Sequence, residues 1–425
     1  MAEERDPARR LRFLWVTRDY PYPANAGDLI YSAGLAQSLA QAGGDLTVLC
    51  SERHGGGATP TDALGLIRWN FVSGELRRPQ SSLFSMLPNV AHRRATRAAV
   101  LALRALLRDE VWDVVVLDHL GTAWALRVVE EVFPNARQRP VLVYASQNHE
   151  ETARFRMARN YRGNLLVRAA LYVDAVKAAR LERSLVEAAD LVTTTTSEDH
   201  LMFSRVHPEK QYTVLTPGYS GNVVRARQIT SSIPRRAVVL GSFEWLAKQM
   251  DLLEFLNAAD AMFAAAGAEL HVVGRAPESF LGAIRGRFRA TKFTGAVEDT
   301  SQHLDSARVG IVPERTGHGF KLKVLDYVFN RVPVAAVEDG VSGMGVPLIR
   351  GESILTYPDM LALSRGVIGI LNDLERLNHL QQSAFSRCLG EFDWQSRGVR
   401  LFREINALVT ARSKAVIGDA EMGGA

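Results

Sequence analysis

Cysteine is nearly absent from this chain of 425 residues, which contains only Cys50 and Cys388. Two cysteines cannot build a disulfide framework, and their scarcity favours a reducing cytoplasm. No stretch approaches the roughly 18 uninterrupted apolar residues of a membrane span. The segment from Met1 to Arg12 is charged and lacks the apolar core of a secretory signal. We therefore expect a cytoplasmic protein.

A strong excess of charge is also absent, because 51 basic residues face 46 acidic ones and the net charge is +5. With no zinc-finger spacing and no aromatic RNA-binding run, we expect no nucleic-acid partner. Lysine is scarce: of the seven in the chain, Lys321 and Lys323 fall in one short segment. A hydrophobic fraction of 47% is typical of a folded globular chain, and the length suits two domains of about 200 residues each.

The sequence alternates between strand-like and helix-like segments, which predicts α/β domains with parallel sheets covered by helices on both faces. A stretch rich in proline, glycine, serine and threonine interrupts this alternation after residue 216. We predict two Rossmann-like domains, residues 1–218 and 237–390, joined by a linker at 219–236. Residues 391–425 are predicted to form a terminal helix and a short tail.

Ligands of such sheets bind beyond the carboxyl ends of the strands, so polar residues at those points are candidates. In the first half, Gly27 and Asp28 occupy a turn between a strand and a helix, where backbone N–H groups can approach an anion. His119 follows a buried strand, and Asn148 and Glu150 follow the next one. Helix capping and loop hydrogen bonds are the alternative explanation for all five. The glycine pattern GxGxxG is absent.

The segment 312–326 is the richest in candidates. Gly319 lies in a glycine-containing loop, and a helix is predicted to begin near Phe320. Lys321 and Lys323 in its first turn are unfavourable to the helix dipole unless an anion, such as a diphosphate, lies there. Asp326 lies one turn further on and can accept hydrogen bonds from sugar hydroxyls. A solvated basic helix end is the alternative.

Other predicted strand ends in the second half also carry small or basic residues. Gly241 and Lys248 flank one loop, Arg275 ends another strand, and Gly295 lies in a turn. None is specific alone. Together they predict a site for an anion at this edge of the second sheet.

Two arginine-rich stretches, Ala91–Arg108 and Ala153–Arg168, contain no acidic residue. Both are compatible with an anionic membrane surface, to which each basic residue contributes about 1 kcal/mol. An ordinary solvated helix face is the alternative for each.

Taken in order, these segments resemble the GT-B glycosyltransferases of the retaining group 1 (GT4-like) family, over nearly the whole length. The resemblance rests on segments in the family's usual order: Pro21–Asp28, Ala188–Ser197, Thr213–Gly218, Gly241–Lys248, Val273–Arg275, Phe293–Gly295, Gly317–Asp326 and Val332–Val334.

The resemblance implies that the two domains face a cleft, with a UDP- or GDP-linked sugar bound mainly by the second domain and the acceptor by the first. It places Lys323 at the diphosphate, Asp326 at the ribose and His119 near the reacting sugar. It implies neither a metal nor a cofactor. One departure is His318, which replaces the first acid of the family's E-x7-E motif.

The resulting expectation is a metal-independent hexosyltransferase that retains the anomeric configuration. Candidate catalytic residues are His119, Lys323 and Lys248, with Asn148 and Glu150 on the acceptor side. The acceptor is expected to be a glycan or lipid-linked, in cell-envelope polysaccharide synthesis at the inner face of the membrane. The alternatives are a sugar-nucleotide epimerase of the same fold and a non-catalytic protein that binds a sugar nucleotide or a partner.

The candidate donor-binding set comprises the remaining residues named above: Gly27, Asp28, Gly241, Arg275, Gly295, His318, Gly319, Phe320, Lys321 and Asp326.

Overall fold

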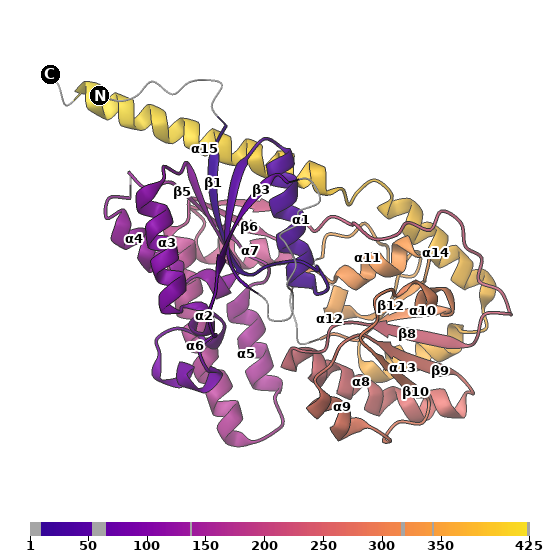
Figure 1. Cartoon of the computed structure of the whole chain (residues 1–425). Coiled ribbons are helices and arrows are strands. Elements are labelled where there is room, and N and C mark those ends of the chain that lie inside the picture. Colours follow the sequence, from indigo (N-terminus) through magenta and orange to yellow (C-terminus); the bar gives the residue numbers. More distant parts are fainter. Residues whose placement is uncertain (1–9, 53–64, 137, 316–318, 342–343, 423–425) are drawn as a thin grey trace. The chain divides into compact units, whose positions relative to one another are not determined.

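The computed structural model describes residues 10–52, 65–136, 138–315, 319–341 and 344–422 (Figure 1). The chain divides into two compact units. The first comprises Met1–Gly218 and Asp393–Ala425, and the second comprises Tyr219–Phe392. His318, one of the candidate residues, lies outside the described residues.

The first unit contains a seven-stranded parallel sheet in the order β3-β2-β1-β4-β5-β6-β7. Its strands are β1 (Arg12–Asp19), β2 (Asp45–Ser51), β3 (Ile67–Val72), β4 (Val114–Asp118), β5 (Val141–Ala145), β6 (Leu191–Thr194) and β7 (Gln211–Val214). Its helices are α1 (Gly27–Gln41), α2 (Asn89–Arg94), α3 (Arg97–Asp109), α4 (Ala125–Val132), α5 (Glu150–Asn160), α6 (Leu165–Ala188), α7 (Ser197–Val206) and α15 (Trp394–Met422), with the short 3-10 segments η1 (Pro79–Phe84) and η2 (Leu120–Thr122).

Helices cover both faces of this sheet, as the apolar strands require. Successive side chains of a strand point to opposite faces, so Phe13 and Trp15 enter one core while Leu14 and Val16 enter the other. Helices α1 and α15 pack on the first face, and α3, α4 and α6 pack on the second. The terminal helix α15 therefore completes the core of the first unit, although it follows the second unit in sequence.

The second unit contains a six-stranded parallel sheet in the order β10-β9-β8-β11-β12-β13. Its strands are β8 (Arg236–Leu240), β9 (Glu269–Val273), β10 (Thr291–Gly295), β11 (Val309–Val312), β12 (Val334–Val337) and β13 (Leu355–Tyr357). Its helices are α8 (Leu246–Ala265), α9 (Glu278–Ile284), α10 (Ser301–Asp305), α11 (Leu322–Phe329), α12 (Glu338–Val341), α13 (Met360–Ile370) and α14 (Leu374–Cys388). Two cores again lie on its two faces, one formed with α8 and α13 and the other with α11 and α14.

The segment predicted as a linker packs along the second unit. The backbone N–H of Val224 donates to the carbonyl of Phe329 at 2.8 Å, and that of Ile229 donates to Asn378 at 2.8 Å. The guanidinium of Arg227 donates to four carbonyl oxygens of the second unit, those of residues 304, 305, 307 and 331. These bonds tie residues 224–229 to that unit.

Among the described residues, no helix combines the length and the apolar composition that crossing a membrane requires.

Candidate functional site

The carboxyl edge of the second sheet is built from closely spaced backbone. Gly274 follows β9 with φ of 136°, and a Cβ there would lie 1.7 Å from the carbonyl oxygen of Gly241, which follows β8. Gly340 lies equally close to the chain after β11, because its Cβ would be 2.2 Å from the carbonyl oxygen of Glu314. Only glycine fits these two positions, so the loops that follow the strands pack backbone against backbone at this edge.

A buried ion pair lies at this edge. Glu314 follows β11 and is 3% exposed, and its Oε1 accepts a hydrogen bond of 2.6 Å from the Nζ of Lys323. Lys323 is itself 9% exposed, and its Nζ lies 5.9 Å from the centre of the Phe243 ring. The same Nζ lies 3.1 Å from where a Cβ of residue 241 would be. The ammonium group is thus held in one place beside the Gly241 backbone.

Three lysines surround the Glu314 carboxylate. Burial alone would raise its pKa, but the positive charges of Lys323, Lys248 and Lys321 hold that pKa below the usual value. The second carboxylate oxygen, Oε2, is buried and has no hydrogen-bond partner among the described residues. The cluster is therefore cationic at a glycine-lined sheet edge, which suits an anionic ligand.

The lysines differ from the expectation in one respect. Helix α11 begins at Leu322, so Lys321 precedes the helix, and only Lys323 lies in its first turn. The Nζ of Lys321 donates to the carbonyl of Gly319 at 3.0 Å. The prediction that both lysines lie in the first turn is wrong, because the loop extends one residue beyond Phe320, to Lys321. Lys321, Lys323 and Lys248, which lies in the first turn of α8, nevertheless all lower the pKa of Glu314 through their charge.

Asp326 lies one turn after Lys323 on α11, where burial raises its pKa to about 6 against the opposing effects of Lys323 and of a hydrogen bond with Tyr219. The Tyr219 hydroxyl also accepts a hydrogen bond of 3.4 Å from the side-chain amide of Asn330. Asp326 is therefore largely ionised near neutral pH, where its carboxylate accepts hydrogen bonds.

The other candidates of the second unit lie at the same edge with less defined contacts. Arg275 is 42% exposed and its Nη1 lies 3.8 Å from a carboxylate oxygen of Glu244. Gly295 ends β10, and its carbonyl accepts a hydrogen bond of 3.0 Å from the N–H of Gly274. Phe320 packs against Phe392, with ring centres 6.0 Å apart. These three residues therefore lie at the same edge as the lysine cluster.

In the first unit, the structure brings His119 and Glu150 together. His119 has a φ of 70°, and its Nδ1 accepts a hydrogen bond of 2.8 Å from the N–H of Gly121. The proton is thereby assigned to Nε2, which lies 3.3 Å from Oε1 of Glu150. Asn148 lies beside them, with its Nδ2 3.5 Å from the same oxygen. A backbone held at positive φ in a non-glycine residue is typical of functional sites.

Glu150 continues into a chain of ion pairs. Its Oε2 accepts a hydrogen bond of 2.8 Å from Nε of Arg154, whose Nη1 lies 2.7 Å from Asp174. Burial opposes ionisation, but Arg154 and His119 hold the pKa of Glu150 well below its usual value. Beneath it, Glu182 accepts from the backbone N–H groups of residues 150 and 151 at 3.1 and 2.9 Å. Burial and the charge of Glu150 raise the pKa of Glu182 to about 8.

Gly27 and Asp28 begin α1. Asp28 forms an ion pair with Arg18, which also lies within electrostatic range of Asp118 and Glu150. The loop residues of the first unit therefore bond mainly to one another.

Sequence reasoning missed three of these residues. Glu314 lies within the segment 312–326 that the sequence singled out. It could have been recognised as an acidic residue close after a buried strand and nine positions before a lysine. Arg18 and Glu182 gave no usable signal, because their partners are distant in the chain. No group of three metal-ligating side chains occurs in the part of the chain that the structure describes.

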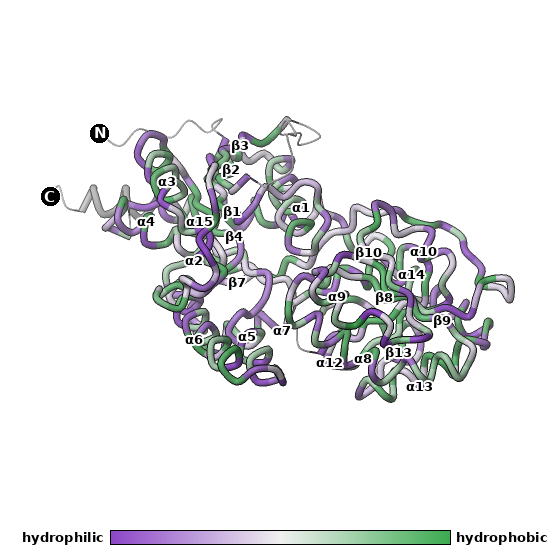
Figure 2. The backbone as a smooth tube through the Cα atoms, turned by 60° about the horizontal axis from the view of Figure 1, so that its bottom comes forward, coloured by the Kyte–Doolittle hydropathy of each residue, from purple (hydrophilic) through white to green (hydrophobic). Residues whose placement is uncertain are grey.

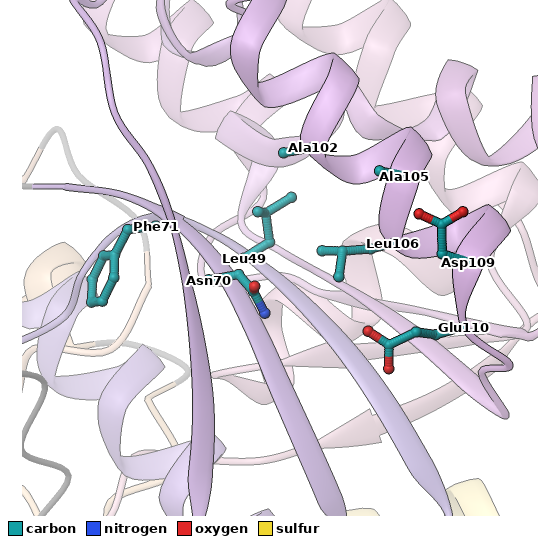
Figure 3. A pocket seen from close by; sticks show the side chains of 8 residues that line it. All are labelled: Leu49, Asn70, Phe71, Ala102, Ala105, Leu106, Asp109 and Glu110. Carbon is teal, nitrogen blue, oxygen red and sulfur yellow. The ribbon is translucent and has the colours of Figure 1, made fainter.

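A separate shallow pocket lies on the first unit between β2, β3 and α3 (Figure 3). None of the candidate residues lines it. Its lining residues are Leu49, Asn70, Phe71, Ala102, Ala105, Leu106, Asp109 and Glu110. Glu110 is bound there to Arg12 and Arg68, at 2.5 and 2.7 Å, so its charge is already neutralised.

Residues 234–373 match the family model described as Glycosyl transferases group 1. The matched segment lies within the second unit and spans less than half of the chain. It contains the glycine-lined edge, Glu314 and the three lysines, whereas His119 and Glu150 lie outside it. No curated protein matches the chain.

The whole chain has the fold of solved GT-B glycosyltransferases. Sucrose-phosphate synthase from Thermosynechococcus elongatus is 17% identical, with a TM-score of 0.68 over 95% of this chain and 100% of that one. WaaG, a glycosyltransferase involved in lipopolysaccharide biosynthesis, is 14% identical, with a TM-score of 0.63 over 93% and 99%. Anabaena Alr3699/HepE, in complex with UDP and glucose, is 14% identical, with a TM-score of 0.59 over 94% and 100%. The prediction of two Rossmann-like α/β domains is confirmed.

Proposed function

We propose that this protein is a retaining glycosyltransferase that moves a hexose from a UDP- or GDP-linked donor to a glycan or lipid-linked acceptor in the cytoplasm. The observation that carries the proposal is the Lys323 ammonium, fixed by Glu314 beside the Gly241 backbone inside the segment that matches the group 1 family model. The HepE complex with UDP and glucose and the pathway of WaaG support the choice of donor and acceptor classes.

The chemistry of glycosyl transfer explains why this edge would suit the donor. As the glycosidic bond breaks, negative charge accumulates on the leaving diphosphate, and groups held in place beforehand stabilise it best. Lys323 would contact that diphosphate, with Lys248, Lys321 and Arg275 adding positive charge, so that no metal is required. Backbone N–H groups of the glycine-lined loops, including Gly319, would add hydrogen bonds.

Other residues would orient the two substrates. Asp326 would accept hydrogen bonds from the ribose hydroxyls, with Phe320 and Gly295 beside it. In the first unit, His119 would contact the reacting sugar, with its imidazole oriented by Glu150 and the Gly121 backbone. Asn148 and Glu150 would serve the acceptor, and Gly27 and Asp28 would lie at the donor's sugar phosphate.

Thermal unfolding across a panel of UDP- and GDP-sugars tests donor binding. A donor at one hundred times its dissociation constant stabilises the protein by about 2.7 kcal/mol, and one nucleotide series should therefore raise the melting temperature. Lys248→Met should reduce that response, whereas Lys292→Met, an exposed lysine of the same unit, should not. A full response in the Lys248 variant would contradict the assigned role.

Product analysis separates the transferase from its rivals. NMR of the product should show a retained anomeric configuration, and chelator should leave the rate unchanged. The presence of His318 in place of the usual acid favours the non-catalytic alternative. Donor binding with no turnover across acceptors would support that alternative, and an epimerised donor formed without acceptor would identify an epimerase.

A further inference from the structure

Helix α6 presents an apolar stripe that no part of the described structure covers. Leu165, Leu166, Val173 and Val176 are 77%, 80%, 46% and 39% exposed. Leu165, Ala169, Val173 and Val176 are spaced by four, four and three residues, which places them on one face of the helix. The buried residues of α6, among them Ala175 and Leu185, lie on the opposite face. The stripe is thus the outward face of a helix that is already packed into the core.

A second apolar segment lies beside this stripe. Leu83, Phe84 and Met86 are 53%, 96% and 81% exposed at and just after η1. This segment is held against α6 by the ammonium group of Lys177, which donates to the carbonyls of Ser82 and Leu83 at 2.8 and 3.3 Å. Exposed apolar residues from two separate segments therefore form one patch, which is unusual for a surface that faces only water.

The patch borders an arginine-rich segment. Residues 153–173 contain five arginines and no acid. Arg159 and Arg162 form no ion pair among the described residues, and both precede Leu165 at the turn between α5 and α6. Figure 2 shows this hydrophilic end of α5 next to the hydrophobic start of α6.

The acids nearest the patch are already paired. Asp174 binds Arg154 at 2.7 Å and also accepts a hydrogen bond from the N–H of Asn89. Glu151 binds Arg183 at 2.6 Å. The surface around the stripe therefore presents Arg159 and Arg162 together with apolar side chains, and Arg168 there lies 5.9 Å from the centre of the Tyr172 ring.

The other arginine-rich stretch, Ala91–Arg108, is organised differently. Arg94 binds Asp19 at 2.6 Å and Arg104 binds Glu131 at 2.6 Å. Leu103 and Leu107 of the same stretch are buried in the core. This stretch contributes to the interior of the first unit, so the argument for a docking surface applies only to α5 and α6.

From this juxtaposition we propose that the outward face of α6, with Leu83, Phe84 and Met86, binds an anionic lipid bilayer surface. The apolar side chains would enter the boundary between headgroups and acyl chains, while Arg159, Arg162 and Arg168 contact lipid phosphates. Charge complementarity selects an anionic bilayer over a neutral one. This inference does not depend on the transferase reaction and holds whichever nucleotide the second unit binds.

Flotation of the full-length protein with phosphatidylcholine vesicles, with and without phosphatidylglycerol, tests the proposal. We expect strong binding only to the anionic vesicles, weakening as salt is added. The triple variant Arg159→Gln/Arg162→Gln/Arg168→Gln should lower the partition coefficient roughly 100-fold, since each arginine contributes about a factor of five. The variant Arg127→Gln/Arg205→Gln/Arg403→Gln removes the same net charge from exposed positions elsewhere in the first unit and should bind almost as wild type does.

The apolar contribution has its own variant and control. Phe84→Gln/Met86→Gln/Leu165→Gln/Leu166→Gln should reduce binding at least ten-fold on anionic vesicles without lowering the melting temperature, because all four side chains are exposed. Leu101→Gln/Val399→Gln, each 51% exposed outside the patch, should bind as wild type does.

Two results would overturn the proposal. The first is no flotation of the wild type with anionic vesicles, or equal flotation of the patch variants and their controls. The second is a dimer, seen by light scattering, that the apolar variant converts to monomer while flotation is unchanged. That outcome would assign the stripe to contact with a second copy of this chain.

Discussion

The carboxyl edges of the two sheets solve the problem of buried charge in different ways. In the first unit, His119, Glu150, Arg154 and Asp174 form a continuous chain of bonded partners. In the second unit, the ion pair between Glu314 and Lys323 lies against closely packed glycine backbone, and one carboxylate oxygen has no partner among the described residues. The charged groups of the first edge are bonded to one another, whereas the lysine cluster of the second edge can still bind an anion. The second edge is therefore better suited to capture a charged ligand.

The largest expected effect tests how much the stability of the second unit depends on the Glu314–Lys323 ion pair. Lys323→Met should destabilise the second unit by about 3–5 kcal/mol, because it leaves the Glu314 carboxylate buried without a cation. The double variant Lys323→Met/Glu314→Gln should regain much of that loss. Urea unfolding measures both.

The matched control is Lys292→Met, whose partner Glu269 is 3.3 Å away and whose side chain is 62% exposed. It should cost no more than about 1 kcal/mol. A Lys323 variant as stable as this control would remove the contrast between the two edges.

The close glycine backbone gives the second prediction. Gly274→Ala should destabilise the second unit by about 3 kcal/mol, since its Cβ would lie 1.7 Å from a carbonyl oxygen at a positive φ. Gly282→Ala in α9 has nothing within 4 Å and should be neutral or stabilising by up to about 1 kcal/mol. Thermal unfolding distinguishes the two, and equal stability would show that the edge tolerates side chains.

The first edge should be less sensitive to loss of one charge. Glu150→Gln should cost about 1.5–3 kcal/mol, since Arg154 keeps Asp174 as a partner. The neighbouring Glu151→Gln, which breaks an exposed pair with Arg183, should cost about 0.2–1 kcal/mol. Denaturant unfolding of both variants checks the order, and a loss at Glu150 greater than that at Lys323 would reverse the comparison.

The remaining prediction concerns the pH dependence that Glu182 gives to the stability of the first unit. Its folded pKa is raised to about 8, so its contribution to stability is fully present below the ordinary glutamate pKa and is lost as pH rises through 8. The wild-type free energy of unfolding should therefore fall between about pH 5 and pH 8 by at most about 1.4 kcal/mol per pH unit. Glu182→Gln should flatten this slope, measured by urea unfolding at several pH values. An unchanged slope would assign it to other groups.

Much of the fold could be predicted because it follows from local patterns. Buried parallel strands read as continuous apolar runs, as in 113–117 and 140–145, and the structure has strands there. The four edge strands β3, β7, β10 and β13 were missed, because their mixed polarity resembles that of loops. The start of α11 was predicted near Phe320 and lies at Leu322, so Lys321 was wrongly placed inside the helix. Glycine-rich loops have no periodicity from which to locate a helix start.

The candidate site was predictable only in part. His119 directly follows β4, and Glu150 and Lys248 lie in the first turns of the helices that follow β5 and β8. All three became candidates because strand ends in a parallel sheet share one edge. The ion pair between Glu314 and Lys323 was not predicted. The two residues come from different elements, and their bond depends on how the loop between them folds.

By itself, the order of apolar and polar residues determined that this chain forms two helix-covered parallel sheets, since that pattern acts locally through burial of strand and helix faces. Only the tertiary structure decided which charged residues form ion pairs and which positions accept no residue but glycine. It also decided that α6 exposes an apolar face. Those features arise from contacts between residues far apart in the chain, and no local pattern encodes them.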